Sequence, residues 1–148
     1  MRVPYLYKGP SGPDVRKAFP EVKCIYRPEI KIAIQYGTSK QKLFALVDSG
    51  ADSCLFPKDV ADVLAIDLHA GIPIMYTGIG GHQVPFYFHE VEIFLDAYRF
   101  KTMACFASAG IGVGAILGQR GFFENFTVAF DYKQNFVEIK ERGMLNTP

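Results

Sequence analysis

The strongest candidate for chemistry in this sequence is a carboxylate that directly follows an apolar segment. Asp48 comes after the four apolar residues 44–47 and is followed by Ser49 and Gly50. A glycine has no side chain and lets the backbone approach another group closely. Taken alone, Asp-Ser-Gly is ordinary turn chemistry, in which the carboxylate caps a neighbouring amide. Because residues 55 and 56 are also apolar, we expect a buried loop, in which a carboxylate needs a polar partner.

The elements that must position this loop are predicted to be strands. Residues 29–36 alternate between large apolar and mostly polar side chains, a period of two that predicts a half-buried strand. Residues 42–48 are almost wholly apolar, as in a strand covered on both faces, and a turn at 37–40 makes the pair a hairpin. Similar strand-like runs occur at residues 71–77, 84–95, 98–107, 114–118, 126–131 and 135–141.

Helix signals are sparse by comparison. Pro57 suits the first turn of a helix over residues 57–64, and residues 119–126 are consistent with a second, shorter turn. Many short strands with so little helix predict an all-β fold, a closed barrel or sandwich with one or two short helices.

The composition predicts one compact, soluble domain. The chain has 148 residues, of which 49% are hydrophobic, enough to bury a sizeable core. Its net charge is only +1, so we expect neither nucleic acid nor a membrane as a partner. No apolar run approaches the roughly 20 residues of a membrane-spanning helix, and the N-terminus lacks the apolar core of a secretory signal. We therefore expect a cytoplasmic protein.

The N-terminal region differs from the rest in its proline content. Four of the nine prolines fall in the first 24 residues, a density that opposes long regular elements. We expect residues 1–24 to form an arm or extension and residues 25–148 to form a single domain. The arm could be an inhibitory propiece, a strap between subunits or a disordered extension.

The metal-ligating residue types show no recognisable site. The three cysteines, Cys24, Cys54 and Cys105, are odd in number and widely spaced, which predicts buried, reduced thiols rather than disulfides or paired zinc ligands. The three histidines and nearby carboxylates also lack ligand spacing, so we expect neither a metal ion nor a cofactor.

Three segments together resemble the retroviral-type aspartic proteases, or retropepsins. Residues 45–53, Ala-Leu-Val-Asp-Ser-Gly-Ala-Asp-Ser, match the family's catalytic signature of apolar residues, Asp, Thr or Ser, Gly and Ala. Residues 75–88 resemble the glycine-rich flap, a hairpin that folds over a bound peptide in this family. Residues 114–118, Gly-Ala-Ile-Leu-Gly, fit the apolar-apolar-Gly segment that threads behind the catalytic loop. The three segments occur in the family's order.

The resemblance implies a retropepsin-like closed β-barrel with a flap hairpin, and activity as an aspartic endopeptidase on extended peptides. In this chemistry two carboxylates share a proton across a water molecule, one as general base and the other as general acid. No other Asp in the sequence is followed by Ser or Thr and then Gly. The second carboxylate is therefore expected from a second copy of the chain, in a two-fold homodimer that pairs Asp48 with Asp48.

The resemblance also implies roles for other residues. Ser49 and Gly50 would brace the paired catalytic loops, and no cofactor is implied. Substrate binding is expected from the loop, the flap and neighbouring strands, at Ala51, Asp52, Leu55, Tyr76, Gly78, Ile79, Gly80, Gly81 and Ile116.

Two other interpretations stay open. A catalytically inactive member of the same fold would serve as a dimerisation or peptide-binding module, although the intact Asp-Ser-Gly-Ala favours catalysis. Ser49 or Cys54 could act as a nucleophile, but neither lies in a recognisable nucleophile motif with a histidine.

One departure from the family concerns the dimer. In retroviral members an arginine commonly follows the apolar-apolar-Gly segment directly, whereas here Gln119 precedes Arg120. Either Arg120 acts from a shifted position, or the dimer is held differently, by the arm or by the C-terminal hairpin.

Overall fold

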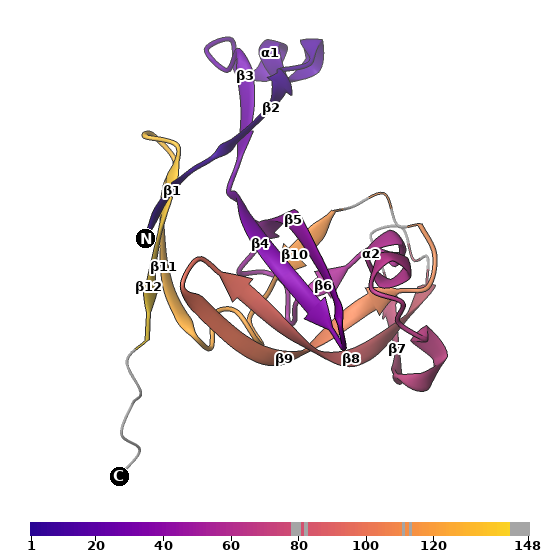
Figure 1. The fold of residues 1–148 in the computed structure, drawn as a ribbon. Helices are drawn as coiled ribbons and strands as arrows, with labels where there is room; N and C mark the ends of the chain where they lie inside the picture. Colours follow the sequence, from indigo (N-terminus) through magenta and orange to yellow (C-terminus); the bar gives the residue numbers. More distant parts are fainter. Residues whose placement is uncertain (78–80, 82, 111, 113, 143–148) are drawn as a thin grey trace.

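The centre of the molecule is a closed barrel of strands (Figure 1). The computed structural model describes residues 1–77, 81, 83–110, 112 and 114–142. Neighbouring strands follow the order β4, β5, β10, β6, β9 and β8, and a pairing of β8 with β4 closes the ring. Their bounds are β4 Glu29–Tyr36, β5 Ser39–Val47, β6 Leu55–Phe56, β8 Gln83–Leu95, β9 Tyr98–Ala107 and β10 Ala115–Leu117. β7, Ile72–Thr77, pairs with the first six residues of β8, 83–88. The predicted all-β closed barrel is thereby confirmed.

The predicted hairpin of β4 and β5 is present. Glu29 lies opposite Leu46, and Tyr36 lies opposite Ser39 next to the turn. The three isoleucines of β4 are buried, as its period of two requires. The expectation that β5 is covered on both faces was wrong, because its alternate side chains point away from the core and Phe44 is 48% exposed.

β10 lies between β5 and β6, the two strands that flank the Asp48 loop. It runs parallel to β5, with Leu117 opposite Val47, and antiparallel to β6, with Ile116 opposite Leu55. The predicted threading of this segment behind the loop is therefore confirmed. A segment from late in the chain holds the loop at both of its ends.

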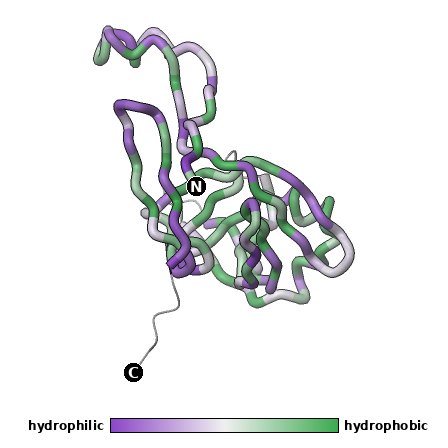
Figure 2. The backbone as a smooth tube through the Cα atoms, turned by 60° about the vertical axis from the view of Figure 1, so that its left-hand side comes forward, coloured by the Kyte–Doolittle hydropathy of each residue, from purple (hydrophilic) through white to green (hydrophobic). Residues whose placement is uncertain are grey.

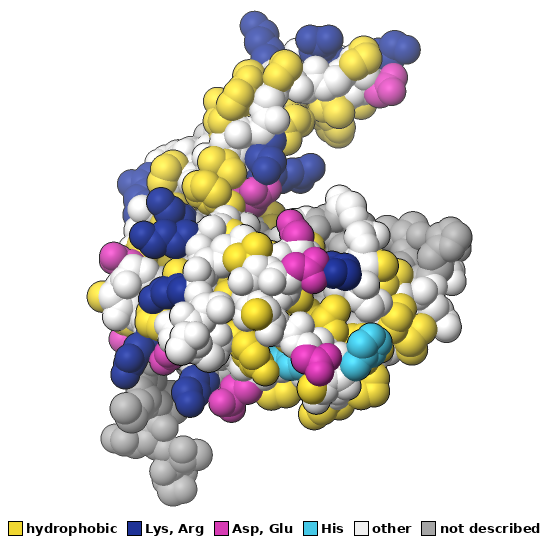
Figure 3. All heavy atoms as spheres, turned by 45° about the vertical axis from the view of Figure 1, so that its right-hand side comes forward, with side chains coloured by type: hydrophobic (Ala, Val, Ile, Leu, Met, Phe, Trp, Pro, Cys, Tyr) yellow, Lys and Arg dark blue, Asp and Glu magenta, His cyan; other side chains and the backbone are white. Residues whose placement is uncertain are grey.

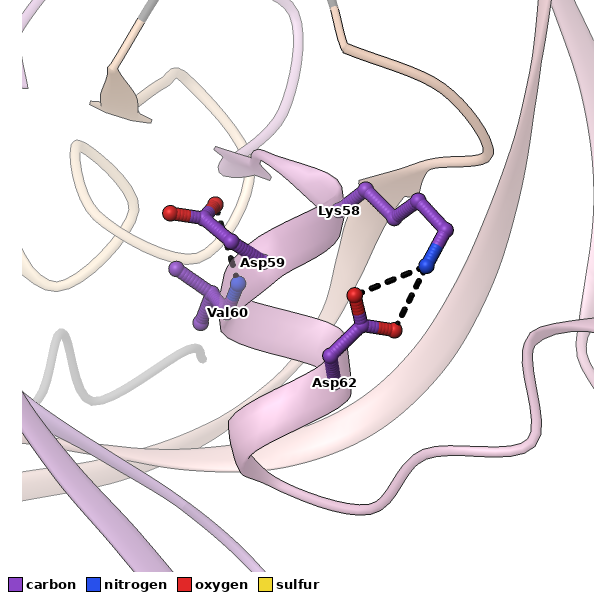
Figure 4. A network of polar contacts seen from close by, with 4 residues as sticks. All are labelled: Lys58, Asp59, Val60 and Asp62. Atoms are coloured by element: carbon purple, nitrogen blue, oxygen red, sulfur yellow. Dashed lines mark hydrogen bonds and ion pairs between the residues drawn. The ribbon is translucent and has the colours of Figure 1, made fainter.

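One short helix packs on the barrel after β6. This helix, α2 (Lys58–Val63), buries Val60 and Ala61 and is followed by a single 3-10 turn, η1 (Leu68–Ala70). On its outer side, Lys58 Nζ lies 2.7 Å from Asp62 Oδ1, and the Val60 amide donates to Asp59 Oδ1 at 3.1 Å (Figure 4). An exposed ion pair of this spacing adds only about 0.3–0.5 kcal/mol, so burial of the inner face is what holds α2 in place.

The barrel interior is packed with aromatic and aliphatic side chains. Phe56 stacks on Phe106 with ring centroids 5.5 Å apart. Phe122 and Phe126 are buried beside them, and they follow β10 in the segment 119–126 that was predicted to form a short turn. That segment does form hydrogen-bonded turns, with the Phe126 amide donating to the Phe122 carbonyl at 3.1 Å.

The two ends of the chain form a second sheet beside the barrel. β1 (Arg2–Pro4) pairs with β12 (Phe136–Glu141), which pairs with β11 (Phe126–Asp131). Val137 and Ile139 of β12 are buried against the barrel core. Within the described part of the chain, no helix has the length and apolar content needed to cross a membrane.

Residues 6–27 form a small projecting unit, which we call the N-terminal lobe. β2 (Leu6–Pro10) and β3 (Cys24–Arg27) pair antiparallel, and α1 (Pro13–Ala18) lies between them in the chain. Figures 1 and 2 both show the lobe standing away from the barrel. The predicted arm is thus folded into short elements, and its strand β2 pairs with a strand that begins at Cys24.

Candidate functional site

Asp48 is the first residue after β5 and is oriented by its own loop. Its amide donates to the Leu117 carbonyl of β10 at 3.1 Å, and its Oδ1 accepts a hydrogen bond from the Gly50 amide at 2.8 Å. The Ala51 amide donates back to the Asp48 carbonyl at 3.3 Å, which closes a tight turn. One carboxylate oxygen is therefore held by the backbone of the Asp-Ser-Gly-Ala sequence.

The loop is less buried in a single chain than the sequence suggested. Asp48 is half-buried, whereas Ser49, Gly50 and Asp52 are exposed. Burial begins with Ser53, at the point where the chain enters β6. Val47 before the turn and Phe56 after it are buried in the barrel, but the turn between them faces outward and is accessible to a ligand or a partner.

The segment after β10 supports the loop through its backbone and one amide side chain. The backbone amide of Gln119 donates to the Ala51 carbonyl at 2.8 Å. Its side-chain Nε2 donates to the Ser49 carbonyl at 2.6 Å. The Arg120 amide donates to the Asp52 carbonyl at 3.0 Å. The sequence marked Gln119 only as a departure from the family pattern, so its role as a loop support was missed.

Gly118 makes this close approach possible. A Cβ at this position would lie 2.3 Å from the Ser53 carbonyl oxygen and 2.7 Å from that of Ala51. Both neighbours are backbone atoms of the loop, so no side chain can rotate out of the way. Glycine is therefore required at this position for β10 to pass behind the loop.

Two of the side chains predicted to bind substrate pack on a second, smaller apolar cluster. Leu55 and Tyr76 pack with the buried residues Phe86, Cys105 and Ala107. Tyr76 also places its hydroxyl oxygen 3.2 Å from Ser53 Oγ, which links β7 to the loop. Ile116 lies opposite Leu55 in the sheet. These three predicted residues therefore lie on adjoining elements next to the Asp48 loop.

A pocket of about 340 Å³ opens beside this cluster. Asp52 and Tyr76 were predicted from the sequence to lie in such a site. The other lining residues were not predicted, and they are Ser53, Ile74, Phe88, Gln119 and Arg120. Ile74 lies on β7 and Phe88 on β8, and the pairing of these two strands brings both side chains next to the loop.

The β7–β8 hairpin corresponds to the segment predicted as a flap. Ile72 lies opposite Phe88 at its base and Thr77 opposite Gln83 at its outer end. The predicted tip residues Gly78, Ile79 and Gly80 lie outside the described residues, as does His82. Gly81 has a φ of +80°, a backbone conformation that favours glycine.

Two buried thiols lie close to the loop. Cys54 and Cys105 are inaccessible to solvent, and burial raises the pKa of each thiol from 9.0 to about 11. A protonated, inaccessible thiol is a poor nucleophile, so Cys54 does not support covalent catalysis. The prediction of a buried thiol was wrong only for Cys24, which is half-buried in the lobe.

We expect these thiols to make the folded state less stable in alkali. The unfolded chain loses their protons near pH 9, whereas the folded chain keeps them until about pH 11. Their contribution is complete below about pH 9 and is lost as the pH rises toward about 11. Urea unfolding at several pH values in this range measures the loss. The Cys54→Ala/Cys105→Ala variant should show a smaller decline, and an unchanged decline would contradict the expectation.

Metal-ligating groups are not clustered in the described part of the chain. No three His, Cys, Asp or Glu side chains there are placed to share a metal ion. His89 is buried, and its Nε2 lies 3.1 Å from the Leu68 carbonyl oxygen, so a backbone group occupies that nitrogen.

Comparisons with known proteins find the same fold in solved structures. No family model and no curated protein sequence matches the chain. A retropepsin-like aspartic protease from Rickettsia conorii aligns over 76% of this chain and 89% of its own, with a TM-score of 0.56 and 19% identity. The retroviral protease-like domain of Ddi1 from Leishmania major aligns over 82% and 98%, with a TM-score of 0.53 and 14% identity.

A viral protease is a weaker match in shape. The EIAV protease, solved with the inhibitor HBY-793, aligns over 63% of this chain and 82% of its own at 26% identity. Its TM-score of 0.45 is too low to support a shared fold by itself. The closed barrel, the threading of β10 behind the Asp48 loop and the first two similarities show that this chain has the retropepsin-like aspartic protease fold.

Proposed function

We propose that this chain is an aspartic endopeptidase that acts as a homodimer, with Asp48 as the catalytic residue of each subunit. The observation that carries the proposal is the Asp48 carboxylate, held by the Gly50 amide at 2.8 Å on an exposed turn. The chain supplies this motif once, so a two-fold axis beside the loop is the simplest way to bring two such carboxylates together.

The proposed reaction uses the two Asp48 carboxylates and one water molecule. The ionised Asp48 takes a proton from the water, whose oxygen attacks the peptide carbonyl carbon. The protonated Asp48 donates its proton to the carbonyl oxygen. The tetrahedral intermediate then collapses and the carbon–nitrogen bond breaks. The leaving amine takes the proton that the first Asp48 received from the water, and a hydroxyl of the intermediate returns its proton to the second Asp48. In a dyad of this kind the two carboxyls share one proton, so one of them supplies the acid.

The surrounding residues support positioning of an extended peptide. Ser49 and Gly50 would brace the paired loops, while Ala51 and Asp52 line the cleft with backbone and charge. Side-chain pockets would be shaped by Leu55, Tyr76 and Ile116, which the fold brings next to the loop. We assign the cover over the peptide to the tip of the β7–β8 hairpin, at Gly78, Ile79, Gly80 and Gly81. Recognition would then add the peptide as a strand beside the loop.

The remaining assignments follow the same proposal. Residues 25–148 would form the protease domain, and residues 1–24 an N-terminal extension of it. Three cysteines free of disulfide bonds suit a reducing compartment such as the cytoplasm.

We expect peptide cleavage to depend on enzyme concentration. Only the dimer contains two Asp48 carboxylates. The specific activity should therefore rise with enzyme concentration and level off once dimers predominate. The purified chain would be incubated with a library of unstructured peptides between about pH 4 and pH 7, with sedimentation at the same concentrations. A chain that is dimeric but cleaves nothing across this range would instead be a dimerisation or peptide-binding module.

A further inference from the structure

The N-terminal lobe joins the barrel next to the proposed catalytic loop. Pro28, the residue after β3, accepts a hydrogen bond from the Val47 amide at 2.9 Å. Val47 directly precedes Asp48, and the next pair along the sheet joins Glu29 to Leu46. The lobe therefore leaves the barrel within one strand position of the loop that has to meet a second copy.

The lobe has little contact with its own barrel. α1 buries none of its residues, and the β2–β3 pairing is only four to five residues long. The Lys8–Glu29 ion pair, at 2.9 Å, is its exposed link to β4. A two-stranded hairpin is marginally stable in water by itself, so a further surface is expected to cover it.

The lobe also exposes large aromatic side chains. Tyr7 is 54% exposed, Phe19 56% and Tyr26 41%. The turn of the β11–β12 hairpin adds Tyr132, at 73%, and borders with β3 a groove of about 480 Å³. Figure 3 shows apolar and basic side chains together on the projecting lobe, with a hollow between the lobe and the barrel. Aromatic side chains exposed in one place are typical of an interface.

The net charges of the lobe and of the rest of the chain have opposite signs. The lobe carries five basic residues against two acidic ones, namely Lys8, Arg16, Lys17, Lys23 and Arg27 against Asp14 and Glu21. The rest of the chain carries thirteen acidic and eleven basic residues. The net charge of the rest of a second copy is therefore opposite in sign to that of the basic lobe, which favours their association.

We propose that the N-terminal lobe is a clasp that closes on the barrel of a second copy of this chain. The proposal rests on the dimeric protease proposed above. When two Asp48 loops meet at a two-fold axis, each lobe starts beside that axis and reaches outward by the length of β2, about 17 Å. In the clasp it lies along the partner, where its aromatic side chains become buried. Two-fold symmetry gives each barrel one clasp from its partner.

Charge reversal on α1 tests the clasp without touching the barrel. Arg16 and Lys17 are exposed, and Arg16→Glu/Lys17→Glu should raise the dimer Kd, measured by sedimentation, by about tenfold or more. Lys40→Glu/Lys42→Glu is the matched control, because these exposed lysines lie at the end of the β4–β5 hairpin opposite Pro28. The control should change the dimer Kd by less than about twofold.

An apolar substitution tests the same surface by other means. Phe19→Ser should also raise the dimer Kd by about tenfold, because a large side chain loses its burial in the dimer. Val63→Ser is its control, since Val63 is similarly exposed, at 58%, on α2. Thermal unfolding of each variant under conditions that keep it monomeric should match that of the wild type, which separates weaker association from misfolding.

Cross-linking shows whether the lobe touches its partner. Dimers would be formed from unlabelled and ¹⁵N-labelled chains and treated with a lysine cross-linker. Among the peptides that join Lys17 or Lys23 of the lobe to a barrel lysine, about half should carry one label of each kind, because random pairing makes half of the dimers mixed. Cross-links found only within one isotope, or variants that dimerise as the wild type does, would overturn the clasp.

The same samples separate failure of the clasp from failure of the protease. A dimer with Asp48-dependent cleavage and no lobe contact in trans overturns only the clasp. A chain that stays monomeric at every concentration overturns both the clasp and the composite active site. Binding of single-stranded nucleic acid that is lost in Arg16→Glu/Lys17→Glu, with dimerisation unchanged, would reassign the lobe to that partner.

Discussion

Asp48→Asn is expected to lower kcat for peptide cleavage by about 10²- to 10⁴-fold while the dimer stays intact. Asparagine has nearly the same shape, and its Oδ1 can still accept the hydrogen bond that the Gly50 amide donates at 2.8 Å. An amide oxygen, however, cannot take the proton of the attacking water. Peptide cleavage and sedimentation of the same preparation measure the two properties together.

A matched substitution controls for the loss of charge. Asp67, which precedes η1, is exposed and makes no capping hydrogen bond, so Asp67→Asn should leave cleavage within about twofold of the wild type. Cleavage retained by Asp48→Asn would remove Asp48 from the mechanism.

Mixed dimers test whether the two carboxylates act as one site. Equal amounts of wild type and Asp48→Asn, allowed to exchange subunits, should retain about one quarter of the wild-type activity, because only that fraction of dimers has both carboxylates. Half of the activity would mean that each chain works alone, and would contradict the composite site.

Gly118→Ala is expected to lower the stability of the folded chain by a large amount. The new Cβ would lie 2.3 Å from the Ser53 carbonyl oxygen, and relief requires β10 or the Asp48 loop to move. We expect a loss of about 2–4 kcal/mol in the free energy of unfolding and a fall of roughly 5–15 °C in Tm. Cleavage should decrease as well, because the same movement shifts the loop that carries Asp48.

Gly114→Ala provides the comparison within the same segment. Nothing lies within 4 Å of a Cβ placed on Gly114, and its φ is not in the left-handed region. The change should shift the free energy of unfolding by no more than about 0.5 kcal/mol. Similar losses in the two variants would show that close approach at Gly118 does not limit stability.

Local patterns in the sequence predicted most of the barrel. β4 has the bounds that its alternating pattern indicated, and it pairs with β5 through the predicted turn. Asp48 was placed correctly after a strand because an apolar run followed by small residues ends a strand wherever it occurs. Period and turn chemistry are local properties, so a single sequence displays them.

Other features depend on contacts between distant segments. β6 has two residues and is a strand only because β10 and β9 lie on either side of it. Phe44 was expected to be buried because its neighbours are apolar, but it shares a face of β5 with the exposed Lys40 and Lys42 and is 48% exposed in a single chain. Gln119 supports the loop across 70 positions of sequence, a contact that no local pattern encodes.

The structure of the N-terminal lobe was also only partly predictable from local sequence patterns. Prolines in residues 1–24 correctly argued against long elements, and the structure contains only short ones there. That β2 would pair with β3 across α1 could not be predicted, because neither strand has a clear period of two.

By itself, the sequence determined most strands of the barrel and which single carboxylate is set into a turn of small residues, because both depend on neighbours within a few positions. The tertiary structure alone decided that Gly118 and Gln119 secure that turn and that the N-terminal lobe starts beside it. These features arise from the pairing of β5 with β4 and with β10, which brings residues 28, 47 and 117 to one place. Closing a ring of strands satisfies the hydrogen bonds of its edges, so the position of every loop on the ring depends on the whole chain.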